Sequence, residues 1–244
     1  MVFGLFSKEK ALQRTIERAT NKLAQQPDRW GAMEALRKDG SEEALFGLCK
    51  RFTVVSHKGS EDEQEKQWVA EVLIGKGEVA FAPVRRFMQK HDQLGFALKV
   101  LGQIVSKERA LEVVDEIIAR EEPGYTRDPE RRLDVIKWLG EWTGVTAQDV
   151  VSRLAPYLKD HSEDVRYFAA EGIAHHGGIP LAAPALIAAL ANPEEEAGRF
   201  KRRVAEILAE AKVPLGDQAD AVRGSLAGPA TTNFAVKDGL IVVR

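Results

Sequence analysis

The chain has 244 residues, with 35 lysines and arginines against 37 aspartates and glutamates, so its formal net charge is −2. This balance predicts no basic field that would draw in nucleic-acid backbones, and the 44% of hydrophobic residues is enough for a sizeable core. The single cysteine, Cys49, excludes an internal disulfide framework and a cysteine-ligated zinc site.

The N-terminal segment predicts an amphipathic helix. Leu12, Ile16 and Ala19 recur at three- and four-residue steps and form one apolar stripe within residues 8–24. We therefore expect residues 1–26 to form an amphipathic capping helix that covers the next helices along the chain.

Residues 27–227 predict a series of helix pairs. Helical patterns of about 12–16 residues alternate there with short breaks that contain glycine or proline. An aliphatic residue recurs late in the first helix of each pair, at Leu36, Ile74, Leu101, Leu139, Ile173 and Leu208. Such a period is typical of helix-pair solenoids. An Ala-Pro dipeptide recurs early in three second helices, where proline is tolerated, at Ala82-Pro83, Ala155-Pro156 and Ala183-Pro184.

The C-terminal residues 228–244 predict a short tail with a β-hairpin. Two apolar runs flank Lys237-Asp238-Gly239, and Asp-Gly between such runs is a hairpin signal. We expect the hairpin to close the last repeat.

Two segments carry a resemblance to a known family. Residues 160–173 resemble the turn and first helix of a HEAT repeat, and residues 181–190 resemble a second helix. The resemblance, to short HEAT repeats of the phycobilin-lyase type, is best over residues 147–192. It implies an all-α, right-handed α-solenoid of about six antiparallel helix pairs over 27–227. It also implies a ladder pair between Asp160 and Arg166, which should end at the sixth pair because Asn192 and Gly198 occupy the matching positions.

No metal site or cofactor is predicted. Glu171 and His175 share one helical face with His176 beside them, and HEAT-like hydroxylases hold iron with His-Glu pairs from several repeats. The matching place in the preceding repeat, residues 140–142, lacks histidine. Cys49 lies on an apolar stripe and is expected to be a buried, inert thiol rather than a nucleophile.

One enzyme hypothesis remains open beside these exclusions. Trp138 and Trp142 lie one turn apart near Asp134 and Glu141, and HEAT-like alkylpurine DNA glycosylases use tryptophans and an aspartate in a basic cleft. The acidic residues interleaved with the basic ones here favour core tryptophans and solvated charges instead. Bilin attachment is a second enzymatic alternative, by family resemblance alone.

The second helices of HEAT-type stacks line a concave surface, where we expect another protein or a peptide segment to bind. The segment 180–191 carries no charge, so it is either packed on every side or an apolar patch. The expected partner-binding residues are Arg85, Arg86, Lys90, Glu112, Glu116, Arg153, Ala185 and Ala189.

The resulting functional prediction is a non-enzymatic, cytoplasmic interaction scaffold with no catalytic residue, no small-molecule substrate and no nucleic-acid partner. The alternatives are a HEAT-like enzyme acting on nucleic-acid bases or bilins, and a membrane-surface adaptor. The adaptor would use the basic N-terminal helix, with Val2, Phe3, Leu5 and Phe6 entering the interface. No membrane span is expected, because glycines and prolines interrupt the long uncharged run at 172–192.

Overall fold

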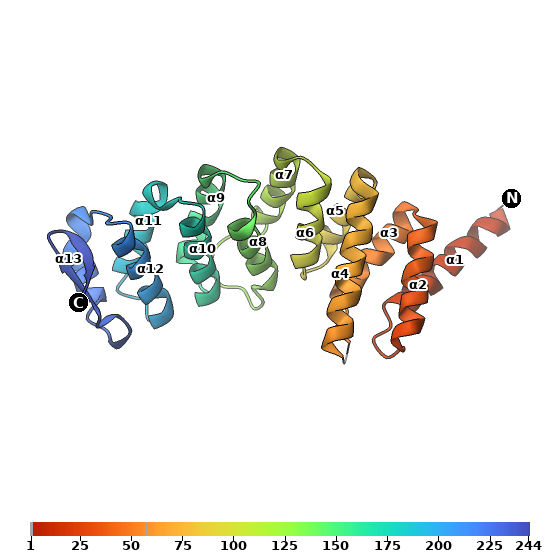
Figure 1. Ribbon diagram of the computed structural model, residues 1–244, viewed down its shortest axis with the longest axis horizontal. Coiled ribbons are helices and arrows are strands. Elements are labelled where there is room, and N and C mark those ends of the chain that lie inside the picture. The colour runs from red at the N-terminus through yellow and green to blue at the C-terminus, as the bar shows by residue number, and fades with distance from the viewer. Residues whose placement is uncertain (1, 57) are drawn as a thin grey trace. The chain divides into compact units, whose positions relative to one another are not determined.

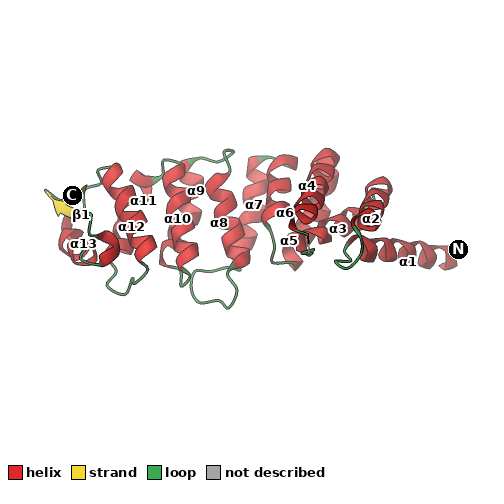
Figure 2. Cartoon of the chain, turned by 60° about the horizontal axis from the view of Figure 1, so that its bottom comes forward, coloured by secondary structure: helices red, strands yellow, loops and turns green. Residues whose placement is uncertain are grey.

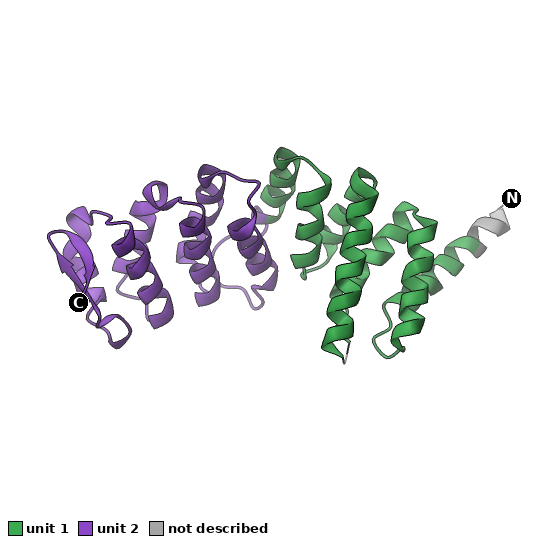
Figure 3. Cartoon of the chain, viewed as in Figure 1, with its two compact units in different colours: residues 1–117 green, residues 118–244 purple. Residues whose placement is uncertain are grey.

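The computed structural model describes residues 2–56 and 58–244, and this part of the chain is predominantly helical (Figure 1). Two compact units divide it, residues 1–117 and residues 118–244 (Figure 3). The sequence predicted one repeat domain over 27–227, and the boundary between the units falls inside that range. A connection at 119–129, which contains Pro123 and Gly124, follows this boundary.

The first unit contains three helix pairs behind an N-terminal helix. Its helices are α1 (Val2–Ala19), α2 (Gln26–Asp39), α3 (Glu42–Cys49), η1 (Lys50–Thr53), α4 (Gly59–Lys76), η2 (Gly77–Ala80), α5 (Phe81–Lys90), α6 (Gly95–Ile104) and α7 (Lys107–Ile118).

The second unit contains three further pairs and the C-terminal hairpin. Its elements are α8 (Glu130–Glu141), α9 (Ala147–Leu154), η3 (Ala155–Lys159), α10 (Glu163–His175), α11 (Ile179–Ala191), α12 (Gly198–Glu210), η4 (Gly216–Gln218), α13 (Ala219–Ser225), η5 (Pro229–Thr231), β1 (Phe234–Lys237) and β2 (Leu240–Val243).

Within the first unit, like helices of successive pairs pack on one another. Helix α4 contacts both α2 and α6, and α3 contacts α5, which is the packing of an α-solenoid. Helix α1 packs on α2 and α3, with Ile16 and Ala19 buried. Gly47 on α3 makes room for Ile16, because a Cβ at Gly47 would lie 2.5 Å from Ile16 Cγ1. The side chains of Val2, Phe3, Leu5 and Phe6 lie outside the described part of the structure.

The second unit repeats this packing. Helix α10 contacts α8 and α12, and α11 contacts α9 and α13. The close approach of α8 to α10 depends on Gly140 and Gly172, because a Cβ at Gly172 would lie 2.8 Å from Gly140 Cα. The all-α repeat architecture predicted from the sequence is therefore confirmed within each unit.

The aliphatic anchors behave as predicted with one exception. Leu36, Leu101, Leu139, Ile173 and Leu208 are fully buried, whereas Ile74 is half-buried.

The Ala-Pro dipeptides match the prediction less well. Pro83 lies in the first turn of α5, but Pro156 lies in the 3₁₀ segment η3. Pro184 lies inside α11, which begins five residues earlier at Ile179. The prediction of a first-turn position for Pro184 is wrong, because Pro180 already occupies the first turn.

The predicted C-terminal hairpin is present (Figure 2). Strands β1 and β2 are antiparallel, with Phe234 opposite Val243 and Lys237 opposite Leu240. The turn residues Asp238 and Gly239 have φ angles of 52° and 72°, the left-handed conformation that a tight two-residue hairpin turn requires. The strands contact α12 and α13, so the hairpin packs on the last helix pair.

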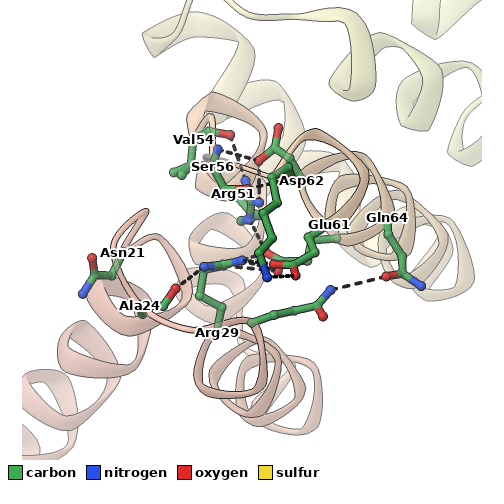
Figure 4. Close-up of polar contacts among 12 residues, drawn as sticks. Asn21, Ala24, Arg29, Arg51, Val54, Ser56, Glu61, Asp62 and Gln64 are labelled. Atoms are coloured by element: carbon green, nitrogen blue, oxygen red, sulfur yellow. Dashed lines mark hydrogen bonds and ion pairs between the residues drawn. The ribbon is translucent and has the colours of Figure 1, made fainter.

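A buried ion network joins α2, η1 and α4 in the first unit (Figure 4). The Glu65 carboxylate accepts hydrogen bonds from Arg29 Nη2 at 2.8 Å and from Arg51 Nε at 2.7 Å. Arg51 Nη2 also donates to Asp62 Oδ1 at 2.7 Å, and Lys66 pairs with the other Asp62 oxygen at 2.8 Å. The side chains of Glu65 and Arg51 are fully buried, so each charge depends on these partners for compensation.

Arginine–carboxylate pairs also link successive repeats of the second unit. Arg132 pairs with the Asp160 carboxylate, and Arg166 Nη2 donates to Glu195 Oε1 at 2.8 Å. Asp160 and Arg166 do contact each other, but through the Asp160 backbone oxygen, which accepts from Arg166 Nη1 at 2.7 Å. The carboxylate–guanidinium pair predicted for these two residues is therefore replaced by a backbone contact.

The predicted end of the ladder is wrong. The sequence placed the acidic position of the sixth pair at Asn192, whereas Glu195 provides the carboxylate. The Ala197 backbone N–H donates to Glu195 Oε1 at 2.9 Å and fixes it within the loop before α12. The ladder consequently extends one repeat further than the residues at 192 and 198 indicated.

Candidate ligand-binding groove

Helix α11 has one buried face and one accessible face. Leu186, Ile187 and Leu190 point into the core, whereas Ala188 is exposed and Ala185 and Ala189 are half-buried. The 13 residues of α11 include no charged side chain. The sequence left open whether this segment is core or patch, and the structure shows that its two faces differ.

A groove of about 1090 Å³ lies along the accessible face of α11. Its other walls come from α9 and η3 and from the loop at 192–197. Its lining includes Ser152, Pro156, Lys159, His161, Ala185, Ala188, Ala189, Asn192, Glu194 and Glu196.

The base of the groove is held by the repeat ladder. Asp160 and Arg166 line the groove, and Arg166 bridges the Asp160 backbone oxygen and the Glu195 carboxylate. Asp160 is 2% exposed and accepts hydrogen bonds from the Gly124 backbone N–H at 3.1 Å and from Arg132. These bonds fix the η3–α10 turn relative to the loop before α12, so the walls of the groove are rigidly placed.

The rim of the groove carries both signs of charge. Lys159 and His161 are exposed on the η3–α10 side, and Glu194 and Glu196 are exposed on the loop before α12. Small and apolar side chains make up much of the remaining lining, including Ala155, Val151 and the alanines of α11. The arrangement suits an elongated ligand with an apolar centre and charged residues beside it.

The predicted site residues are divided between the two units. Ala185 and Ala189 line the groove of the second unit. Arg153 lies on α9 outside the groove lining and donates from Nη1 to the Asp149 backbone oxygen at 3.0 Å. The remaining five, Arg85, Arg86, Lys90, Glu112 and Glu116, belong to the first unit.

Three of the five predicted site residues in the first unit form ion pairs within that unit. Arg85 on α5 forms an ion pair with Glu116 on α7, and both side chains are 41% exposed. Arg86 forms an ion pair with Glu43, and its guanidinium carbon lies 4.1 Å from the centre of the Phe46 ring. Glu112 is exposed on α7.

Of the histidine and glutamate positions weighed as metal ligands, Glu171 is engaged by an arginine. Glu171 forms hydrogen bonds with Arg203, at 2.5 Å and 3.2 Å from its two oxygens. Burial alone raises the pKa of Glu171, but these bonds lower it overall. Across residues 2–56 and 58–244, no group of three or more metal-binding side chains gathers in one place.

Cys49 and the pair of Trp138 and Trp142 are packed against other side chains, as the sequence predicted. The Cys49 thiol is fully buried, and burial raises its pKa. Trp138 and Trp142 are half-buried, and their stacked rings lie 4.4 Å apart at the end of α8. Neither feature faces the groove.

The N-terminal helix presents a basic face. Lys8, Lys10, Arg14 and Arg18 are exposed on α1. Their exposure agrees with the membrane-adaptor alternative and equally with a basic face that contacts only solvent. None of the helices in the described part of the chain is long and apolar enough to cross a bilayer.

Sequence reasoning missed the acidic rim and the cationic contacts around Phe46. The rim residues Glu194 and Glu196 lie in a loop, where no periodic pattern marks their position. Glu195 lies three residues beyond the expected acidic position, Asn192. The Asn192-Pro193 pair marks a loop there, and it was the signal in the sequence that the acidic position could lie further along the chain.

Comparisons with known proteins give limited guidance. No protein-family model and no curated protein match the chain. Among solved structures it is similar to human deoxyhypusine hydroxylase in complex with glycerol, at 16% identity and a TM-score of 0.34, with 94% of each chain covered. That protein is an enzyme, whereas the sequence predicted a non-enzymatic scaffold, and that prediction is not carried further. A similarity of this degree assigns no activity, substrate or metal to this chain.

Proposed function

We propose that the repeats are HEAT-like and that the second unit binds a peptide segment in the groove along α11. The observation that carries this proposal is the accessible, uncharged face of α11 with charged residues at the rim of its groove. The proposal assigns the class of ligand, a peptide, and assigns no reaction to the chain.

The groove favours a peptide over a compact small molecule. Its volume of about 1090 Å³ lies near the upper end of the roughly 300–1,000 Å³ of small-ligand pockets, so the lining rather than the volume favours a peptide. The alanines at 185, 188 and 189 allow the backbone of a ligand to approach α11 closely. An apolar segment of a peptide would cover them, as amphipathic segments do in apolar grooves.

The charged rims give the peptide an expected pattern. Lys159 favours an acidic residue beside the apolar segment, and Glu194 and Glu196 favour a basic residue there. Exposed rim charges mainly set the association rate and its dependence on salt. The apolar contact with α11 should therefore determine the dissociation rate.

A random peptide library displayed on phage and selected against the full chain tests the proposal. The dissociation constants of the selected peptides would be measured by fluorescence anisotropy for the wild type, Ala188→Glu and Ala189→Glu. A carboxylate on the accessible face of α11 should weaken binding at least about tenfold, because it is desolvated beneath an apolar peptide.

The matched control is Ala221→Glu, an exposed alanine on α13 away from the groove. It should bind the selected peptides as the wild type does. Peptides that bind Ala188→Glu, Ala189→Glu and the wild type equally would contradict the proposal. Loss of the helical circular-dichroism signal in Ala188→Glu would also contradict it, because that residue would then belong to the core.

A further inference from the structure

Three cationic side chains of the first unit surround one aromatic ring. The Phe46 ring on α3 has the Arg86 guanidinium carbon 4.1 Å, Lys50 Nζ 5.1 Å and Lys90 Nζ 5.8 Å from its centre. Phe46 is only 4% exposed, so the cations cover the ring. Each cation gains a favourable contact with the ring, but the three also repel one another.

Acidic neighbours neutralise only part of this charge. Glu43 on α3 pairs with Arg86. Lys50 is half-buried and Lys90 is exposed, and no carboxylate within the described residues forms an ion pair with either lysine. Asp92 lies beyond Lys90 on the loop after α5. Of the three cations, only Arg86 therefore has a carboxylate partner among the described residues.

The pKa of the adjacent His91 reflects the positive charge of these lysines. Its ring stacks on Phe87, with the ring centres 4.6 Å apart. Burial lowers the pKa of His91, Lys50 and Lys90 lower it further, and Asp92 raises it. Both lysines therefore act electrostatically on one imidazole as well as on one ring.

We propose that Lys50, Arg86 and Lys90 form an anion site that binds a phosphate monoester. A phosphate monoester carries about −1.5 to −2 charges at neutral pH and offers three acceptor oxygens, one for each cation. A carboxylate, with one charge and two oxygens, satisfies the cluster less completely. Arginine provides a planar donor fork and the lysines provide point charges, both of which are common phosphate ligands. This site lies in the first unit and is independent of the groove proposed for the second.

Phosphate binding is measured through the imidazole resonance of His91. Inorganic phosphate is titrated into the full chain at a constant ionic strength of about 0.15 M, so that the Debye length stays at ~8 Å throughout the titration. The His91→Gln variant assigns the resonance. Bound phosphate should move it saturably and raise the pKa of His91, because the anion offsets Lys50 and Lys90. Glycerol phosphate and a phosphoserine peptide are titrated in parallel, and the tighter ligand identifies the source of the phosphate.

Variants separate a site from a general salt effect. Lys50→Gln/Lys90→Gln should weaken phosphate binding at least about tenfold, and Lys50→Arg/Lys90→Arg should retain it. The matched control is Lys38→Gln, an exposed lysine on α2 that should bind as the wild type does. The absence of a saturable shift in the wild type would overturn the proposal. An equal shift in the double glutamine variant, with its helical signal intact, would overturn it as well.

Discussion

The buried network of the first unit makes Glu65 a strong test of what stabilises this fold. The Glu65→Gln substitution keeps the shape of the side chain but removes the negative charge that faces Arg29 and Arg51. Its amide nitrogen would then oppose guanidinium donors. All three side chains are at most 2% exposed, so water does not replace the lost charge, and only Asp62 and Glu61 remain opposite the two cations.

The expected cost is about 3–5 kcal/mol of unfolding free energy, the range measured when one partner of a buried ion pair is removed. The assay is urea unfolding followed by circular dichroism. Glu116→Gln serves as the control, because its pair with Arg85 is 41% exposed and should contribute less than about 1 kcal/mol. A loss below about 1 kcal/mol for Glu65→Gln would refute the argument.

Three further predictions follow from single contacts. Burial raises the pKa of Asp62, but hydrogen bonds from Lys66, Arg51 and Ser56 lower it overall. The stability that ionised Asp62 contributes is therefore present above about pH 4 and is lost as the pH falls through the pKa of the folded state. Urea unfolding should show that the difference in unfolding free energy between wild type and Asp62→Asn becomes smaller in acid. Gly172→Ala should lower the free energy of unfolding by about 1–3 kcal/mol in the same assay, because its Cβ would lie 2.8 Å from Gly140 Cα. The control Gly224→Ala should be neutral or stabilising, because no atom lies within 4 Å of its Cβ. Equal effects of the two substitutions would contradict this. Duplex DNA should give no mobility shift below about 1 µM at physiological salt, because a three-cation cluster neutralises too few phosphates, and tight salt-sensitive binding would contradict that.

The repeat architecture could be predicted because its signals are local. Apolar residues at three- and four-residue steps place Leu36 and Leu208 in the core whatever the neighbouring repeats contain. The hairpin turn follows from Asp238 and Gly239, which tolerate positive φ. Ala185 and Ala189 line the groove, and they were predicted as binding residues from the absence of charge along their helix.

The charged contacts could not be predicted, because they depend on tertiary distances. Arg29 and Glu65 are 36 positions apart, and a sequence pattern does not separate them from solvated charges on a helix face. Glu195 replaces Asn192 in the ladder because the loop before α12 brings it to Arg166, and loop geometry leaves no periodic signal. The Phe46 ring lies on α3, whereas its cations lie on η1 and α5, so their convergence appears only when these elements pack.

Site-specific photo-crosslinking tests the central claim, peptide binding along α11, most directly. A photoreactive amino acid would replace Ala188 on the exposed face of α11 or Ala221 on α13, and each protein would be irradiated with a selected peptide. The account predicts a crosslink to the apolar centre of the peptide from position 188 and none from position 221. A peptide that binds with unchanged affinity but crosslinks from neither position, or equally from both, would contradict it.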